Sequence, residues 1–524
     1  MPMRSVKTDA VSPLLRSREV ELKLALTTSD PAGLAQCLAR TPLLARRKPT
    51  RVHLHNVYYD TPEQALRQQR VALRIRRKGS EAQPQWLQTL KTGGNGDSAL
   101  STRGEWEWSV PGPELVLDVL QTATPWPRID PDGKLFGSLR RCFVTDFERT
   151  TWLVRRRDGS LVEVAFDVGH IAAGSKTAAI CELELELLSG QPQVLFDIAQ
   201  QLATTIAVLP LNASKAERGY ALTQDAVDAP VRARPVALTP DLALAEAARR
   251  ILRETFGQFT ANVNTLRGSN DPEVVHQARV GWRRFSSAGR LFRSSLAAHP
   301  AAERQALQPL LSFLGALRDH DVAGTETLPP LAQPFVAGDS RRAGAWESMA
   351  QALQQAASLL RKSVRYALED PALGAALLAT TRWLELMPDL QAAGNATAAV
   401  KMPLRRWAKR RIDRHNERLE QALRHADSPE TWHRVRILCK RMRYDIEALQ
   451  PLLPKRRTQR RYQNAVRLQA DLGAQRDLVQ ASLVVNAVEA DRALVEFLRG
   501  VAVGKTTVPK GKPPLAQRQA QPKT

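Results

Sequence analysis

The sequence predicts a multi-domain α+β protein. We expect an N-terminal antiparallel β tunnel barrel with covering helices, followed by an all-α domain built from pseudo-repeated helical bundles. Three observations lead to this. The chain has 524 residues, more than one ordinary domain holds. Charged and apolar residues alternate in short stretches up to about residue 224, as in half-buried strands. Beyond residue 241 the alternation gives way to helical spacing and an internal repeat.

The composition limits the classes of ligand and the cellular compartment that we expect for this protein. Hydrophobic residues make up 43% of the chain, enough for a substantial core, and the formal net charge is +23. Such a charge favours polyanions as ligands. The four cysteines, at positions 37, 142, 181 and 439, show neither zinc spacing nor a disulfide framework. Together with the lack of an apolar run before residue 18 or of a bilayer-length apolar stretch, this predicts a cytoplasmic protein with no membrane partner.

The first predicted strand covers residues 19–24. Successive side chains of a strand point to opposite faces, so Glu19, Glu21 and Lys23 share one face and the apolar residues share the other. Carboxylates suit Mg²⁺ or Mn²⁺, which bridge readily to phosphate, and the ammonium suits the polyanion itself. The alternative is a half-buried strand with a solvated charged face.

Further alternating stretches follow, after a helix predicted at 30–40. Acids gather on some of them and bases on others, so that left unpaired they would repel. In a closed barrel they would face one another across a polar interior, with the apolar faces packed against helices. The expected strands cover residues 53–60, 72–76, 86–91, 103–108, 147–154, 163–167 and 181–187.

These motifs resemble the CYTH family, also called triphosphate tunnel enzymes. Residues 19–23 read Glu-x-Glu-x-Lys, and 214–220 read Ser-Lys-Ala-Glu-Arg-Gly-Tyr. Between them, in family order, stand Arg74-x-Arg76, Lys91, residues 103–105, Arg149, Asp167 and the glutamates at 182, 184 and 186. The resemblance implies an antiparallel tunnel barrel that acts on triphosphates with Mg²⁺ or Mn²⁺. The wording of the last two motifs is most similar to bacterial inorganic triphosphatases.

The resemblance and the chemistry of these side chains together suggest a role for each. Cations would neutralise the triphosphate, carboxylates would hold the metal, and a few groups would orient the attacking water, because phosphoryl transfer needs mainly positioning and charge neutralisation. The predicted substrate-binding residues are Lys23, Arg74, Arg76, Lys91, Arg103, Arg149, Lys215 and Arg218. The predicted metal ligands are Glu19, Glu21, Glu182 and Glu184, and the catalytic candidates are Glu105, Asp167 and Lys91.

The second half contains two similar segments, 275–284 and 432–441, each followed by a second match at 314–319 and 472–477. On a helix, residues spaced at i, i+3 and i+7 share a face, which gives each segment a basic stripe. The spacing resembles the CHAD domain, a helical module that binds inorganic polyphosphate and commonly follows CYTH. The alternative is a solvated basic face. The predicted polyphosphate-binding residues are His276, Arg279, Arg283 and Arg284 in the first stripe, and His433, Arg436, Lys440, Arg441 and Arg443 in the second.

The first stripe departs from the pattern, because Ser286-Ser287 stands where the second stripe continues with Arg443. We therefore expect a weaker first stripe. The expected organisation is a tail at 1–17, the tunnel domain at 18–224, a linker at 225–240, the helical domain at 241–503 and a basic disordered tail at 504–524.

The preferred hypothesis is metal-dependent hydrolysis of inorganic triphosphate to pyrophosphate and phosphate, with long-chain polyphosphate bound by the helical domain. Two alternatives remain: a nucleotide cyclase or other organic triphosphatase on the same fold, and a non-catalytic polyphosphate-binding scaffold. Nucleic acid is a less favoured partner, because the sequence shows no known nucleic-acid-reading motif.

Overall fold

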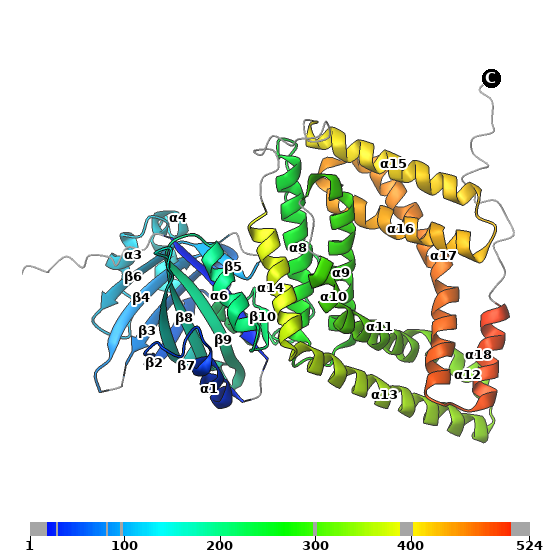
Figure 1. Cartoon of the computed structure of the whole chain (residues 1–524), viewed down its shortest axis with the longest axis horizontal. Coiled ribbons are helices and arrows are strands. Elements are labelled where there is room, and N and C mark those ends of the chain that lie inside the picture. Colours follow the sequence, from blue (N-terminus) through cyan, green and yellow to red (C-terminus); the bar gives the residue numbers. More distant parts are fainter. Residues whose placement is uncertain are drawn as a thin grey trace, which may run out of the picture. The chain divides into compact units, whose positions relative to one another are not determined.

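The computed structural model describes residues 18–27, 30–79, 82–94, 98–296, 301–387 and 402–504. Both predicted tails, apart from residue 504, lie outside these ranges. Within them, the N-terminal half is a curled antiparallel sheet and the C-terminal half is helical, which confirms the predicted fold class (Figure 1). None of the described helices combines the length and the apolar character that crossing a bilayer requires.

The sheet contains ten strands in the order β10-β1-β9-β8-β7-β2-β3-β4-β6, with β5 paired to β1. Gly104 separates β5 from β6, and its carbonyl accepts a hydrogen bond from the Thr92 amide at 3.0 Å. This one stretch therefore pairs with β1 at its start and with β4 further on, and joins two distant parts of the strand order. The strands are β1 Glu19–Leu26, β2 Thr50–Asp60, β3 Val71–Lys78, β4 Gln85–Thr92, β5 Leu100–Arg103, β6 Glu105–Val110, β7 Arg140–Arg155, β8 Leu161–Ala173, β9 Lys176–Ser189 and β10 Val208–Pro210.

The apolar face of the sheet packs against short helices. Leu22 and Leu183 belong to a buried cluster with Phe196 of α6, and Leu73 belongs to a second cluster with Trp126 of α4. The opposite face carries the charged residues, so alternation in the strands sorts charge to one side and the core to the other. The helices of this region are α1 Pro31–Arg40, α2 Ala65–Gln68, α3 Leu117–Gln121, α4 Trp126–Ile129, α5 Lys134–Ser138, α6 Gln193–Ala203 and α7 Lys215–Thr223.

Helix α7 is capped at its N-terminus and held against the sheet by residues further along it. Ser214 caps its N-terminus in a capping box with Glu217. Gly219 lies directly on Phe143, where a Cβ would be 2.1 Å from the ring, so that only glycine permits this approach. The Tyr220 hydroxyl donates to the buried Asp60 carboxylate at 2.7 Å. These contacts set the position from which Lys215 and Arg218 project.

The helical half is split between two compact units. The first unit comprises Met1–Val236, Ala245–Leu310 and Arg365–Asn395, and the second comprises Ala237–Leu244, Leu311–Val364 and Ala396–Thr524. The sheet therefore shares its unit with helices from beyond the predicted linker. The helices are α8 Leu244–Thr265, α9 Pro272–Leu291, α10 Ala301–Ala306, α11 Gln308–Val322, α12 Ala332–Val336, α13 Ser340–Leu368, α14 Pro371–Glu385, α15 Leu404–Arg424, α16 Pro429–Leu449, α17 Lys455–Ala487 and α18 Arg492–Gly504.

Within the first unit, α14 packs directly on the sheet domain. A Cβ on Gly374 would be 2.1 Å from the Val208 carbonyl of β10, and Leu378 is buried in the same cluster as Leu22 and Phe196. The second unit has its own apolar core, to which α12, α13, α17 and α18 contribute.

Candidate active site

The charged face of the sheet lines a cavity of about 1300 Å³. Alternation places every second side chain of β1, β3, β7 and β9 on this face, and α7 adds side chains from one side. The structure brings all eight predicted substrate-binding cations to the cavity wall. They are Lys23, Arg74, Arg76, Lys91, Arg103, Arg149, Lys215 and Arg218.

One group of ion pairs surrounds the start of β1. Arg103 donates to Glu19 at 2.7 Å and lies 2.5 Å from a Glu21 oxygen. Lys91 lies 3.0 Å from both Glu19 and Glu105, and thereby links β4 to β1 and β6. We call Glu19, Glu21, Glu105, Lys91 and Arg103 the β1 cluster. Two of the predicted metal ligands and two of the catalytic candidates thus lie together here.

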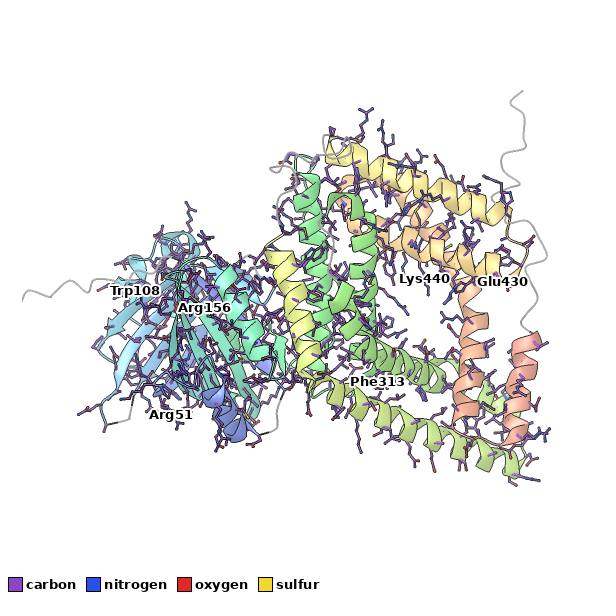
Figure 2. The ribbon with its side chains drawn as sticks, in the orientation of Figure 1. Arg51, Trp108, Arg156, Phe313, Glu430 and Lys440 are labelled. Atoms are coloured by element: carbon purple, nitrogen blue, oxygen red, sulfur yellow. The ribbon has the colours of Figure 1, made fainter. Side chains whose placement is uncertain are left out.

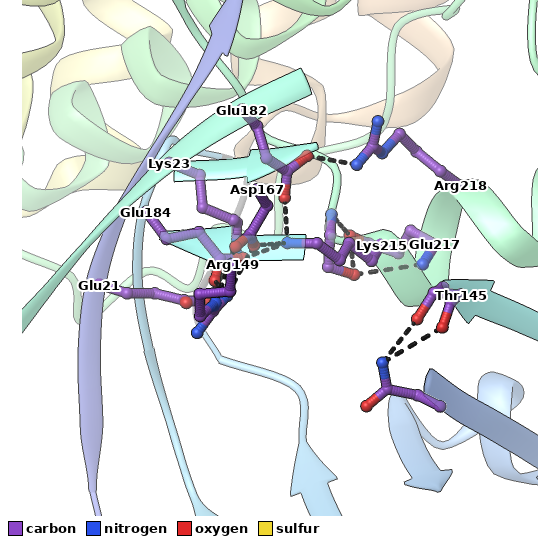
Figure 3. A network of polar contacts seen from close by, with 12 residues as sticks. Glu21, Lys23, Thr145, Arg149, Asp167, Glu182, Glu184, Lys215, Glu217 and Arg218 are labelled. Carbon is purple, nitrogen blue, oxygen red and sulfur yellow. Dashed lines mark hydrogen bonds and ion pairs between the residues drawn. The ribbon is translucent and has the colours of Figure 1, made fainter. Parts of the chain in front are cut away.

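A second group centres on the ammonium of Lys215 (Figure 3). It donates to Asp167 at 2.6 Å, to Glu184 at 2.9 Å and also to Glu182. Arg149 makes a bidentate contact with Asp167 at 2.6 and 2.7 Å and also bonds Glu184. We call Lys215, Arg149 and these three carboxylates the Lys215 cluster; Arg218 adjoins it through Glu182. The two remaining metal candidates therefore lie with Asp167, and the structure distributes the predicted set of four over two clusters.

Burial and cations act in opposite directions on the carboxyl groups. Burial alone would raise the pKa of Glu19, but Lys91 and Arg103 outweigh it and hold that pKa below its usual value. The pKa of Glu105 is lowered in the same way, against burial, by Lys91 and Arg74. For Glu184, burial is again opposed, chiefly by Lys215 and Arg149, and its pKa lies well below the usual range. These side chains are thus carboxylates near neutral pH.

The residues of the Lys215 cluster fit a hard divalent cation. Oxygen atoms of Asp167, Glu182 and Glu184 lie within 4.8 Å of one another, and within the described parts of the chain these three form the acidic group close enough to share an ion. Carboxylate oxygen is the donor that Mg²⁺ and Mn²⁺ prefer. The Lys215 ammonium contacts all three side chains, so it would have to share or give up this position.

Several residues of the site were not among the sequence candidates. Glu107 lies 3.9 Å from Arg76, and Asn56 accepts a hydrogen bond from Arg76 at 2.8 Å. The Tyr58 hydroxyl accepts one from Arg74 at 3.3 Å. Alternation along residues 103–108 puts Glu107 on the same face as Arg103 and Glu105, which is a usable signal. Asn56 and Tyr58 carry no charge, and nothing in the pattern distinguished them from ordinary strand residues.

The basic stripes lie on long helices, the first on α9 and the second on α16, as predicted. Figure 2 shows Lys440 projecting from α16. Arg284 of the first stripe is ion-paired with the buried Glu254 of α8 at 2.9 Å and also bonds Gln258. Arg443 of the second stripe lies 3.4 Å from Glu447 and over the Tyr444 ring. The same two helices carry the other stripe residues, His276, Arg279, Arg283, His433, Arg436, Lys440 and Arg441. The role of the stripes in polyphosphate binding stays a prediction.

Comparison with known families assigns the sheet-containing half and the helical half of the chain to two different families. Residues 17–220 match the CYTH domain family, and residues 250–485 match the CHAD domain family. The chain therefore carries a CYTH domain followed by a CHAD domain.

Among individual proteins, an inorganic triphosphatase of Haemophilus influenzae is 38% identical over 210 residues. The match covers 39% of this chain and 55% of the relative, so the chain spans about half of that relative's length.

Solved structures show likeness to each half. A crystal structure of the CHAD domain of the plant Ricinus communis has 27% identity and a TM-score of 0.46, covering 54% of this chain and 93% of that one. A Hippeastrum structure, described as a putative adenylyl cyclase with a dominant triphosphatase activity, has 19% identity and a TM-score of 0.29. It covers 39% of this chain and 95% of that one.

Proposed function

We propose that the tunnel hydrolyses inorganic triphosphate to pyrophosphate and phosphate. The observation that carries the proposal is the gathering of eight basic side chains, from β1, β3, β4, β5, β7 and α7, around one cavity. Guanidinium groups suit bidentate contacts with phosphate, and ammonium groups supply point charges. The relative named inorganic triphosphatase supports the choice of substrate.

Charge balance supports the dependence on a divalent cation. Carboxylates on the inner face are about as numerous as the cations, and both the β1 cluster and the Lys215 cluster join the two kinds of group. A triphosphate adds several negative charges to a nearly neutral cavity, so its binding needs further positive charge. Mg²⁺ or Mn²⁺ held by Asp167, Glu182 and Glu184 would supply that charge and polarise the phosphate oxygens. We propose Glu19 and Glu21 as further ligands or as groups that orient Arg103.

In the reaction, the oxygen of a water attacks the terminal phosphorus and the bridging P–O bond breaks, with pyrophosphate leaving. Glu105 and Asp167 are the candidates to accept the proton of that water or to hold it in line. Lys91 lies 3.0 Å from Glu105, so it can hold this carboxylate in place and also neutralise the leaving pyrophosphate. The equatorial oxygens of the phosphate would be held by Arg74, Arg76, Arg103 and Arg149. The reaction requires no covalent intermediate.

We propose a separate role for the CHAD domain, namely binding of long-chain polyphosphate by the stripes on α9 and α16. The stripes repeat the same spacing of basic residues. This spacing resembles that of CHAD, the helical module associated with inorganic polyphosphate. The alternatives to the tunnel reaction are a nucleotide cyclase or organic triphosphatase and a scaffold that binds phosphate without hydrolysing it. A cytoplasmic location completes this proposal.

One substrate panel separates these functions. Purified protein is incubated with tripolyphosphate, ATP, thiamine triphosphate and long-chain polyphosphate, with Mg²⁺, with Mn²⁺ and with EDTA, and phosphate release is measured. The proposal predicts metal-dependent release that is fastest from tripolyphosphate. Faster release from ATP or formation of a cyclic nucleotide would favour the organic substrates. Binding without release under every condition would favour the scaffold.

A further inference from the structure

The cavity continues beyond the sheet along one face of helix α8. The lining residues of α8 recur every three or four positions, which places them on a single side of the helix. They are Glu254, Gly257, Gln258, Ala261, Asn264 and Thr265, and Arg267 follows just after the helix. The volume of about 1300 Å³ exceeds the roughly 300–1,000 Å³ of ordinary ligand pockets. The wall built by α8 therefore encloses room beyond the cations of the sheet.

Arg267 brings a further cation into this extension. Its Nη2 donates to the Leu26 carbonyl of β1 at 2.5 Å, which holds the guanidinium at the cavity wall and uses one of its five N–H groups. Cys181, Arg218 and Glu182 are its charged or titratable neighbours. Arg218 bonds Glu182, and Glu182 also accepts from Lys215.

These contacts place two guanidinium groups beside one carboxylate at this end of the cavity. Arg218 and Arg267 both neighbour Glu182, and Glu182 also accepts from Lys215, whose ammonium is shared with Asp167 and Glu184. Two guanidinium groups beside one committed carboxylate form an arrangement that an anion with several oxygens can neutralise.

We propose that Arg218 and Arg267 form a phosphate subsite for linear polyphosphates longer than triphosphate. The inference rests on the proposed function, because it extends the same substrate chain from Arg218, one of the eight tunnel cations, to Arg267. Its consequence is that a residue of the helical half helps to select the substrate of the tunnel. Tripolyphosphate would be held mainly by the sheet and α7, whereas a longer chain would also contact Arg267.

The test compares two substrates in variants of the full chain. Arg267→Ala is expected to raise KM for medium-chain linear polyphosphate about tenfold, as the loss of a charge-assisted contact implies. KM for tripolyphosphate should change by less than about twofold. Arg250→Ala is the matched control, because Arg250 lies on α8, pairs with Glu246 at 2.8 Å and is not among the cavity-lining residues. Where the longer chain is not cleaved, its inhibition constant against tripolyphosphate replaces KM.

Equal changes for the two substrates, or no change for either, would overturn the subsite. Arg267→Lys keeps the charge and should show an intermediate effect, and it replaces the alanine variant if the latter fails to fold. If the unmodified protein hydrolyses neither substrate, the proposed function fails. The subsite is then tested separately by equilibrium dialysis of both phosphates against the same variants, where the same chain-length difference is expected and its absence overturns the inference.

Discussion

Buried carboxyl groups behave differently in the tunnel and in the helical half. Burial raises the pKa of Asp321 in α11 and of Glu385 in α14, and in each case the paired arginine and a second arginine nearby only partly offset the rise. In the tunnel, burial acts on Glu184 in the same direction, yet its pKa lies well below the usual range because Lys215 and Arg149 oppose burial together. The difference lies in the cations that bond directly to each acid: Asp321 and Glu385 each bond one arginine, whereas Glu184 bonds both Lys215 and Arg149.

This difference indicates what each region is built to hold. One arginine per acid gives a structural ion pair, in which attraction and desolvation nearly cancel. A carboxylate among several cations stays charged, and the cations around it stay charged as well. The tunnel thus keeps a dense set of ionised groups out of bulk water, which is useful for binding a metal and a polyanion and costly without one.

The largest effect is expected from removing the cation at the centre of the Lys215 cluster. Lys215→Met should lower the free energy of unfolding by about 3–5 kcal/mol, because it leaves buried carboxylates without their shared partner. Lys176→Met, which removes an exposed pair with Asp225, should cost less than about 1 kcal/mol. Chemical denaturation of both variants measures the difference.

The response to Mg²⁺ provides a second comparison between Lys215→Met and Lys176→Met. If the three carboxylates of the cluster can share an ion, Mg²⁺ should restore part of the stability lost in Lys215→Met and should do nothing for Lys176→Met. Equal losses in the two variants would show that Lys215 is not the centre of a buried network. An equal response to Mg²⁺ would argue against an ion in the cluster.

The second largest effect is expected from low pH, which should lower the stability of the protein mainly through the carboxylates of the tunnel. The folded pKa values of Glu19, Glu105 and Glu184 lie below the ordinary value of 4.5, so the unfolded chain takes up protons first as pH falls. Their stabilising contribution is therefore complete above about pH 5 and is lost as pH falls through the folded values. Thermal unfolding followed between pH 7 and pH 3 should show a plateau and then a decline. A decline that begins above pH 6 would point to groups outside the tunnel.

A smaller effect is expected from the basic stripes. Arg436→Ala with Lys440→Ala should weaken binding of long-chain polyphosphate by about tenfold, and more than Arg279→Ala with Arg283→Ala. The reason is that the first stripe lacks a counterpart of Arg443, and its Arg284 is committed to Glu254.

Titration of the full chain at several salt concentrations measures this difference, with duplex DNA of matched charge as a control. Binding should weaken steeply with salt, because counterions leave the polyanion. Equal affinity for DNA, or no difference between the two double variants, would leave the stripes as a general basic surface.

Alternation in the sequence was sufficient to predict most of the sheet and its charged inner face. It missed β10, which has three residues, and it did not separate β5 from β6, because the break depends on how Gly104 fits between Thr92 and Trp106. Both are tertiary effects that a period of two does not record.

The grouping of site residues was less predictable. Which carboxylates Lys215 joins depends on where α7 sits, and that position depends on Gly219 and Tyr220 meeting residues far away in the chain. The contribution of α8 to the cavity wall was also invisible, because a linker separates it in sequence from the tunnel domain. Spacing predicts which residues share a face of one element, but not which elements meet.

The central claim is that the Lys215 cluster supports metal-dependent hydrolysis of triphosphate. It is tested most directly by phosphate release from tripolyphosphate, with Mg²⁺ and with EDTA, for Glu184→Gln and for Glu148→Gln. Glu148 is exposed, lies on the same sheet and is not among the cavity-lining residues. We expect Glu184→Gln to lose at least about tenfold in kcat/KM, or about 1.4 kcal/mol, with partial recovery at high Mg²⁺, while Glu148→Gln stays unchanged. Release that persists in EDTA, or full activity of Glu184→Gln, would contradict the account.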